Sequence, residues 1–208
     1  NLRTLSTYYT DVNQPGSYGR VATRSYPTGD WIAYQYDEMG RLTQEVQPWL
    51  NAPFNSEPAK ARATYYSYEP LDARDEVLVD DSRPRTKEEK ILGITVRKEF
   101  QAFYFDDDQY VEIRELATAP EAQYGTATNL RTEKRYYAKG DCTSPNAGRL
   151  HTVVYPNQTM ETYSYEYGNW QPNPDPAAST FTPNPDGSAV RMSVVYGAKD
   201  APDGVAYK

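Results

Sequence analysis

Aromatic residues recur along this chain at positions two apart, followed by an acid. Four segments share the order aromatic, any residue, aromatic, acid: Tyr34-Gln35-Tyr36-Asp37, Tyr66-Ser67-Tyr68-Glu69, Phe103-Tyr104-Phe105-Asp106 and Tyr163-Ser164-Tyr165-Glu166. Two positions is the side-chain period of a strand, so both rings of a pair should face the same side of a sheet. A strand that recurs in this way predicts a repetitive all-β array rather than a single catalytic pocket.

Turn residues place these strands in antiparallel hairpins. The run Pro27-Thr28-Gly29-Asp30 predicts a turn, because proline presets φ and glycine supplies a positive φ. No segment of twelve or more residues has the pattern of an amphipathic helix. The expected strand pairs are Val21–Tyr26 with Trp31–Tyr36 followed by Arg41–Val46, Ile94–Phe105 with Tyr110–Leu116, and Leu150–Tyr155 with Met160–Tyr167.

Irregular segments separate the strands. Gln47–Lys60 carries three prolines and is expected to be a surface loop, and Gln171–Gly187, rich in Pro, Asn and Asp, is expected to be an extended loop. Asp80–Lys90 is dense in charge and predicts a solvated loop or a short turn of helix. The fold class is therefore all-β, with repeated hairpins forming a curved or spiral antiparallel sheet with Pro-rich loops.

A longer repeat overlies the hairpins. Asn1-Leu2-Arg3-Thr4 recurs 128 positions later as Asn129-Leu130-Arg131-Thr132, and Tyr8-Tyr9 recurs as Tyr136-Tyr137. The segment Tyr34–Asp37 matches Tyr163–Glu166 one position further along. The order of the matches is kept over most of residues 1–80, so the chain reads as one unit of about 128 residues, 1–128, and part of a second, 129–208.

Composition predicts a thin, aromatic core. Leu, Ile, Val and Phe make up only 32 of the 208 residues, a proportion typical of disordered chains. Twenty tyrosines compensate, because each ring buries a large area while its hydroxyl finds a polar partner or water. Such a chain suits a sheet or shell better than a thick helical interior.

Charge and hydropathy narrow the partners. A net charge of −7 disfavours nucleic acid, which needs a basic surface, and no run of about 18 apolar residues predicts insertion into a membrane. The sequence begins directly in patterned residues, as expected for a fragment of a longer, processed chain. With one cysteine and one histidine, a zinc site or a histidine-dependent triad would need residues of another chain.

The segment Tyr34-x-Tyr36-Asp37-x-x-Gly40-Arg41-Leu42 resembles the YD repeat of the RHS (rearrangement hotspot) proteins. That family includes bacterial polymorphic toxins, shell components of ABC toxin complexes, wall-associated bacterial proteins and animal teneurins. The other copies depart from the pattern: Asp72-Ala73-Arg74, Gln109-Tyr110-Val111 and Asn169-Trp170 stand where Gly-Arg-Leu is expected. The resemblance implies β-hairpins wound into a spiral sheet that closes as a hollow shell around a toxin polypeptide.

In this reading the motif is architectural. Aromatic residues of successive hairpins should form ladders across strands, and the acid should bond its own backbone to start the turn. The glycine should take a positive φ, and the arginine should pair with an acid one hairpin away. The structural residues are Tyr34, Tyr36, Asp37, Gly40, Arg41, Tyr66, Tyr68, Phe103, Phe105, Tyr163, Tyr165 and Glu166.

The expected function is non-enzymatic: a section of shell wall in a large exported bacterial protein, extracellular or on the cell surface. Its partners would be neighbouring repeats, identical copies or an enclosed toxin polypeptide. Two alternatives stay open, namely a tandem segment of an extracellular fibre or adhesin joined through sheet edges, and a carbohydrate-binding module. The aspartyl self-cleavage signature of RHS cores is missing, so no catalytic residue is carried over, and no cofactor is expected.

Other chemistry has weaker support. Trp49 and Trp170, expected in loops, are the candidates for sugar contact, whereas Trp31 is expected to pack inside. The acidic run Asp106-Asp107-Asp108 with Asp80-Asp81 is a conceivable Ca²⁺ site, but it lacks the spacing of a calcium loop and favours a solvated turn. An acid and base pair of Glu112 and Glu115 is disfavoured, and so is a catalytic thiol at Cys142. Asn157 is noted as a candidate acceptor for glycosylation.

Overall fold

A computed structural model describes residues 3–75, 82–140 and 143–199, and within them the protein is all-β. Its two helical elements, η1 (Pro58–Lys60) and η2 (Pro176–Ala178), are single turns of 3₁₀ helix, and no helix in the described ranges is long and apolar enough to cross a bilayer. The strands are β1 (Leu5–Tyr8), β2 (Val21–Ser25), β3 (Trp31–Tyr36), β4 (Leu42–Gln47), β5 (Arg62–Ser67), β6 (Thr86–Ile91), β7 (Ile94–Asp106), β8 (Gln109–Leu116), β9 (Leu130–Tyr136), β10 (Leu150–Val154), β11 (Thr159–Gln171), β12 (Thr180–Pro183) and β13 (Ala189–Ala198).

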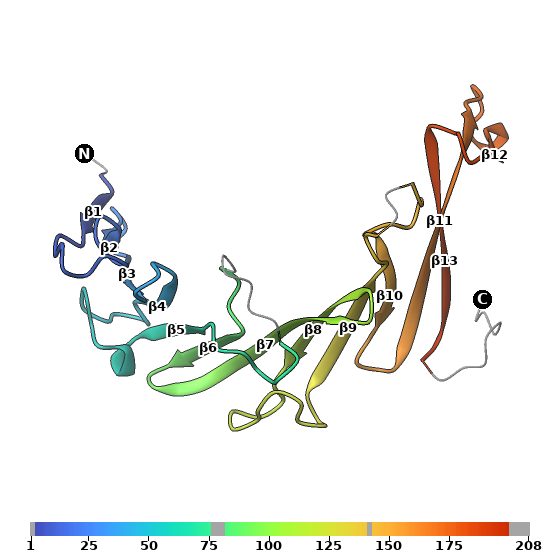
Figure 1. Ribbon diagram of the computed structural model, residues 1–208. Helices are drawn as coiled ribbons and strands as arrows, with labels where there is room; N and C mark the ends of the chain where they lie inside the picture. Colours follow the sequence, from blue (N-terminus) through green and yellow to red (C-terminus); the bar gives the residue numbers. More distant parts are fainter. Residues whose placement is uncertain (1–2, 76–81, 141–142, 200–208) are drawn as a thin grey trace. The chain divides into compact units, whose positions relative to one another are not determined.

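These strands form one antiparallel sheet whose spatial order follows the chain from β1 to β12, with β13 paired to β11 (Figure 1). Each connection therefore joins strands that are neighbours in the sheet, apart from the link to β13. The order does not return to β1, so the sheet is open among the described strands. Short turns form the hairpins β2–β3, β3–β4, β6–β7, β7–β8 and β10–β11, and longer loops make most of the other connections.

The chain divides into two compact units. The first comprises Asn1–Ala73, Val77–Ala102 and Glu115–Leu130, and the second comprises Arg74–Glu76, Phe103–Arg114 and Arg131–Lys208. Strands β7 and β8 contribute residues to both.

In the first unit a small core lies beneath Trp31. Its indole is 2% exposed and packs with Val46, Ala61 and Ala63. The proline-rich segment after β4 folds over the ring: the indole N–H donates to the carbonyl of Ala52 (3.4 Å), and the ring of Phe54 meets it edge-on at 5.9 Å. Ala63 on β5 and Ala61 just before it let the large indole approach the sheet, so one tryptophan fills most of this core.

In the second unit the buried side chains come mainly from the middle strands. Phe103 and Tyr104 of β7 and Val111 and Ile113 of β8 are at most 5% exposed, and Val153 of β10 is 4% exposed. Consecutive residues are buried on β7 and β8, so both faces of the sheet are covered in this region.

The turns follow the predicted chemistry. Between β2 and β3 the N–H of Gly29 donates to the carbonyl of Tyr26 (3.0 Å), and Gly29 has φ of 91°. The N–H of Tyr26 donates to the carbonyl of Asp30 (2.8 Å) and closes the hairpin. The predicted strands 21–26, 31–36, 41–46, 94–105, 110–116, 150–155 and 160–167 are confirmed to within a few residues at their ends.

Two predictions of loop structure are wrong. The charged segment Asp80–Lys90 is not a loop or a helix throughout, because Thr86–Ile91 is strand β6, paired with β5 and β7. The positions 171–187 contain strand β12, which pairs with the end of β11. The charges of β6 have partners across and along the strand: Glu89 pairs with Arg62 of β5 at 2.8 Å, and Glu88 pairs with Lys90 of β6 at 3.4 Å. Cross-strand pairs of this kind offset the low strand propensity of charged residues.

One register of three strands occurs twice. In β1, β2 and β3 the rows are Leu5–Ser25–Trp31, Ser6–Arg24–Ile32 and Thr7–Thr23–Ala33. In β9, β10 and β11 they are Glu133–Val154–Met160, Lys134–Val153–Glu161 and Arg135–Thr152–Thr162. Every member of the second set lies 128 or 129 positions after its counterpart, and the same irregularity follows the third row in both.

Trp31 should dominate the stability of the first unit. Trp31→Ala is expected to lower the free energy of unfolding by about 3–5 kcal/mol, because it leaves a cavity beneath the 48–57 segment and removes the contact with Phe54. Urea unfolding followed by circular dichroism measures this. The matched control is Trp170→Ala, whose indole is 54% exposed and whose removal should cost within about 0.5 kcal/mol. Equal losses for the two variants would contradict this placement of the core.

Candidate functional site

The first motif copy forms a tight turn held by its own acid. The backbone N–H of Arg41 donates to Asp37 Oδ1 (2.8 Å), and the N–H of Asp37 donates to the carbonyl of Arg41 (2.9 Å). Gly40 donates its N–H to the carbonyl of Asp37 (3.0 Å) and has φ of 78°, a conformation in which a Cβ is strained. The predicted roles of the acid and the glycine in the turn are confirmed at this copy.

The arginine of this copy joins two successive hairpins. Arg41 Nε donates to Asp37 Oδ2 (2.7 Å), and the guanidinium carbon lies 4.2 Å from the ring centroid of Tyr68, beyond β5. The Tyr68 hydroxyl in turn donates to the carbonyl of Leu42 at the start of β4 (2.9 Å). The prediction that Arg41 pairs with an acid one hairpin away is wrong: its acid belongs to its own turn, and its contact on the next hairpin is an aromatic ring.

The pKa of Asp37 is lower than that of an ordinary aspartate. Burial favours the neutral acid, but the N–H of Arg41, its guanidinium and its positive charge together outweigh burial and lower the pKa of Asp37. About a fifth of each side chain of the Asp37–Arg41 pair is exposed, so the pair is screened less than one in open solvent.

The tyrosines of the first copy anchor strands through their hydroxyls. The Tyr36 hydroxyl donates to the carbonyl of Val21 (3.2 Å), and the Tyr9 hydroxyl donates to the carbonyl of Tyr34 (2.6 Å). The rings of Tyr9 and Tyr36 meet edge-on at 6.2 Å, and the Arg20 guanidinium lies 5.5 Å from the Tyr36 ring. Burial raises the pKa of both Tyr36 and Tyr9. The contacts across strands are therefore hydroxyl-to-backbone bonds and arginine–ring contacts as much as ring ladders.

The second copy is less regular. Tyr66 is half-buried on β5, and its pKa is raised by burial and then by the nearby charge of Glu45. After Tyr68 the N–H of Glu69 donates to Ser67 Oγ (3.3 Å), a local bond rather than the acid-to-backbone bond of the first copy. A shallow groove runs between the first two copies, and its lining residues are Asp37, Glu38, Met39, Arg41, Thr43, Tyr66, Ser67, Tyr68 and Glu69.

The third copy lies at the end of β7 in the second unit. Phe103 is buried and Phe105 is 54% exposed, and both rings contact Tyr110, at 6.2 Å and 5.6 Å. The Arg74 guanidinium lies 4.7 Å from the ring of the buried Tyr104. Asp106 forms an ion pair with Arg135 (2.6 Å), so its carboxylate is engaged in a contact between strands.

The acidic turn after this copy does not form a metal-binding group. Asp107 takes φ of 52° in the tight turn between β7 and β8. Among the described residues, no group of three or more His, Cys, Asp or Glu side chains could hold a metal ion. Asp80, Asp81 and Cys142 lie outside the described residues.

The fourth copy does not turn. Strand β11 runs past Tyr163, Tyr165 and Glu166 as far as Gln171, and Glu166 pairs with Arg191 of β13. Asn169 and Trp170 stand where the first copy has Gly40 and Arg41, so this copy lacks both the positive-φ residue and the arginine that close the first turn. Tyr137 keeps the contact seen at Tyr9: its hydroxyl donates to the carbonyl of Tyr163 (2.9 Å).

A groove lies along the fourth copy as well. It is lined by Thr143, Pro145, Tyr165, Glu166, Tyr167, Pro183, Asn184 and Pro185. The N–H of Tyr165 donates to Asn146 Oδ1 (3.0 Å), and the Arg149 guanidinium lies 5.0 Å from the Tyr165 ring. The arrangement provides aromatic and prolyl surfaces with a carboxylate at their side.

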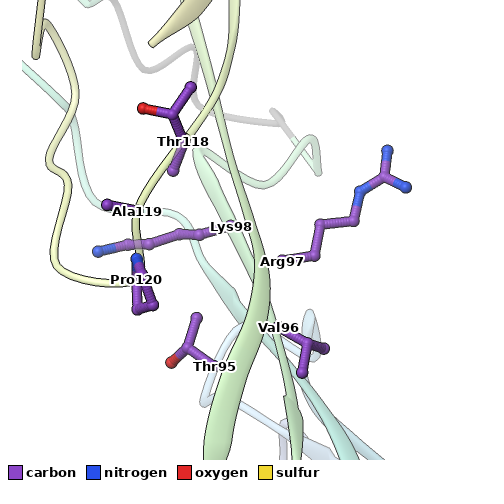
Figure 2. Close-up of a pocket in the computed structure, with 8 residues that line it drawn as sticks. Thr95, Val96, Arg97, Lys98, Thr118, Ala119 and Pro120 are labelled. Carbon is purple, nitrogen blue, oxygen red and sulfur yellow. The ribbon is translucent and has the colours of Figure 1, made fainter. Parts of the chain in front are cut away.

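A smaller pocket in the first unit is lined by β7 and the 117–120 segment. The Lys98 side chain runs toward Ala119 and Pro120, whereas Arg97 points away (Figure 2). Lys98 Nζ donates to the carbonyl of Ala122 (3.1 Å), so its ammonium is held by the backbone. Lys98 therefore lines this pocket as a structural residue that connects β7 to the segment after β8.

The two candidate tryptophans have different settings. Trp49 is half-buried and lies in the loop after β4, as predicted, with its carbonyl accepting from the N–H of Ala52 (3.1 Å). Trp170 was expected in a loop, but it lies on β11 opposite Phe181 of β12. Its exposed indole is therefore mounted on a strand.

The remaining candidates take part in local contacts. Asn157 accepts from the N–H and the hydroxyl of Thr159 (3.1 and 2.7 Å) at an exposed turn. His151 stacks on Tyr137 at 4.2 Å, and its Nδ1 lies 3.1 Å from Gln109 Nε2. Burial, with a smaller contribution from Arg135, lowers the pKa of His151. Glu112 binds Arg114 (2.6 Å), and Glu115 accepts from Asn129 and from the N–H of Gly125 (2.9 and 2.8 Å).

Sequence reasoning missed the tyrosines that precede the motifs. Tyr9 and Tyr137 supply the hydroxyls that tie the 34 and 163 positions to the neighbouring chain. Their signal was present, because both residues recur at the 128-position spacing.

A scan against models of known protein families finds no match, and no curated protein matches the chain.

The Asp37 turn should show a distinctive pH dependence. Asp37→Asn is expected to lower the free energy of unfolding by about 1 kcal/mol at pH 7, because the ion pair with Arg41 is lost. The folded-state pKa is lowered, so this contribution is complete above the unfolded value of about 3.9 and disappears as the pH falls below it. Urea titrations of both proteins from pH 7 to pH 2.5 measure the difference.

The control for this experiment is Glu57→Gln. Glu57 pairs with Lys60 at 3.5 Å, but about three quarters of each side chain is exposed, so its replacement should change stability by less than about 0.5 kcal/mol at any pH. A constant difference between wild type and Asp37→Asn across the pH range would show that the ion pair contributes nothing.

Proposed function

We propose that this chain is a structural, non-enzymatic β-repeat segment of a large exported bacterial protein of the RHS type. In that role it forms part of the wall of a shell around a toxin polypeptide, outside the cell or at its surface. Residues 1–128 would be one unit of the repeat and residues 129–208 part of the next. Its immediate partners would be neighbouring repeats of the same parent chain.

The observation that carries this proposal is the doubled register. Strands β1–β3 and β9–β11 pair row for row at a spacing of 128 or 129 residues, although most of the side chains in those rows differ. The tyrosine-to-carbonyl bonds from Tyr9 and Tyr137 recur at the same spacing. Repeated strand units that contact chiefly their neighbours are typical of extended arrays.

The motif residues support an architectural role. Asp37 closes a turn, Arg41 connects it to the ring of Tyr68, and Tyr68 bonds back to Leu42. The polar groups that define the resemblance to the YD repeat are thus engaged in holding consecutive hairpins together. Groups committed to such contacts are poor candidates for acid–base chemistry, which needs a proton exchanged with substrate.

Electron microscopy of the native particle that contains this chain tests the shell. A closed, hollow body of fixed size is the expected result. Filaments whose axial repeat matches the 128-residue unit would overturn the shell and identify a fibre. The particle should be purified at physiological ionic strength without denaturant, so that its assembly is not altered.

A fibre or adhesin joined through sheet edges is the second candidate, and β13 is the observation that favours it. This strand has ten residues and pairs only with β11 among the described strands, without a bulge or a proline. Val190, Met192, Val195 and Tyr196 are exposed. A long apolar edge of this kind is a template for pairing with another strand.

The edge is tested by placing a charge on it. If β13 joins copies, Val195→Lys should reduce the average mass in sedimentation at micromolar concentration toward that of a single chain, because lysine blocks edge pairing. Leu50→Lys, at a loop position that is 83% exposed, should leave the mass unchanged. A wild-type protein that sediments as a single chain would remove the support for the fibre.

Sugar contact at Trp49 and Trp170 stays a prediction. The exposed indole of Trp170 on β11 is the better placed of the two, since Trp49 is half-buried in its loop. Aromatic rings presented on a rigid strand suit stacking on a sugar.

A further inference from the structure

One face of the second unit gathers three tyrosines around a carboxylate. Glu161 of β11 accepts hydrogen bonds at Oε2 from the hydroxyls of Tyr155 (3.0 Å) and Tyr163. Tyr196 of β13 lies directly opposite Glu161 in the sheet register, so its ring stands on the same face, and it is 56% exposed. Glu161 Oε1 accepts no hydrogen bond from a described residue.

The corresponding face of the first unit has a different charge at its centre. The register places Arg24 where the second unit has Val153, and Ile32 where it has Glu161. Arg24 stands on the same face as Tyr26 and Tyr34, and the nearby Tyr26 and, to a smaller extent, Tyr34 raise the pKa of Arg24. In the first unit the tyrosine face therefore contains an arginine of its own.

The second unit has the corresponding tyrosines, but valine stands at the position of Arg24. Tyr155 and Tyr163 are the counterparts of Tyr26 and Tyr34 at a spacing of 129 residues. The nearest cation on the same row is Lys134 of β9, two strands from Glu161, and it forms no ion pair with it in the described part of the chain. The row of Glu161 therefore has a carboxylate and an aromatic ring but no arginine, and the Arg149 guanidinium lies farther along the face, over the Tyr165 ring.

Elsewhere in the described residues, this fold repeatedly places an arginine over a tyrosine. The guanidinium-to-ring distances are 5.5 Å for Arg20 and Tyr36, 4.2 Å for Arg41 and Tyr68, 4.7 Å for Arg74 and Tyr104, and 5.0 Å for Arg149 and Tyr165. In the Arg41 case an aspartate binds the same guanidinium from the side. At this position a ring face together with a carboxylate holds the arginine.

We propose that Tyr155, Glu161, Tyr163 and Tyr196 form a binding site for a guanidinium group, presented by an arginine side chain of another polypeptide segment. The planar cation stacks on an exposed tyrosine ring and donates to Glu161 Oε1, while the two tyrosine hydroxyls hold the carboxylate in place at Oε2. A guanidinium suits the site better than an ammonium, because it is planar, less strongly hydrated and able to stack and donate at once.

The test is a titration of the ¹⁵N-labelled chain with Nα-acetyl-arginine amide, followed by the amide resonances of 153–165 and 190–198. Saturable shifts confined to these strands are expected. Nα-acetyl-citrulline amide, which has nearly the same shape without the charge, should bind at least roughly fivefold more weakly, and added salt should weaken the arginine probe. Equal binding of both probes, or shifts spread over the chain, would overturn the proposal.

Variants locate the site. Glu161→Gln should weaken binding of the arginine probe roughly fivefold, since it removes the negative charge and keeps the shape. Tyr196→Ala removes an exposed ring on an edge strand and should weaken it by a similar factor without unfolding the chain. The matched control is Glu45→Gln, a carboxylate of the first unit beside Tyr34 and Tyr66, which should leave binding unchanged.

The outcomes are distinguishable even if one variant is damaged. The dispersion of amide resonances reports whether each variant is folded. If Glu161→Gln does not fold, the binding measurement on Tyr196→Ala tests the site instead. Unchanged binding in a folded Tyr196→Ala and a folded Glu161→Gln would remove the site. None of these outcomes bears on whether the parent protein forms a shell or a fibre, so the two proposals fail separately.

Discussion

The hydrogen bond from a tyrosine hydroxyl to a backbone carbonyl on another strand is the interaction on which the rest of this structure depends. A chain with so few aliphatic residues cannot build a thick interior, so each ring must cover sheet surface while its hydroxyl finds an acceptor. Tyr9, Tyr68 and Tyr137 meet both needs by donating to carbonyls of Tyr34, Leu42 and Tyr163. Each bond also fixes the register of the strand that accepts it, so the same side chain covers the sheet and determines its pairing.

Arginine side chains add a second contact to these tyrosines. A hydroxyl bond satisfies the polar end of a tyrosine but leaves the face of its ring exposed to water. A guanidinium over the ring covers the face and carries its charge to the surface. At Arg41 the charge is balanced by Asp37 in the same turn, which is why the motif needs its acid and its arginine four positions apart. Where Asn169 and Trp170 replace the glycine and arginine, the turn is lost and β11 runs on to Gln171. The motif residues therefore decide where a strand ends.

The sequence predicted the parts of the fold that local chemistry controls. The β2–β3 hairpin and the Asp37 turn follow from proline, glycine and aspartate at fixed offsets, and their geometry is as expected. Strand β6 was missed because Thr86–Ile91 has four charged residues in six, and a partner such as Arg62 for Glu89 comes from a neighbouring strand. The partner of Arg41 was wrong for a related reason: the closeness of Asp37 depends on the turn, and the position of Tyr68 depends on how β5 returns to β4. Contacts set by tertiary placement are invisible to a pattern along the chain.

The doubled register separates what the backbone requires from what the side chains add. Between the rows Ser6–Arg24–Ile32 and Lys134–Val153–Glu161 every side chain differs, yet the pairing is the same. The register must then be set by groups that do not change, namely the turns at Gly19 and Gly148, which have φ of 73° and 67°, and the tyrosines next to them. The positions in these rows are free to vary because they do not fix the pairing. Valine in place of Arg24 and glutamate in place of Ile32 leave the strand pairing unchanged, but they exchange a cation for a carboxylate that can be satisfied from outside the molecule.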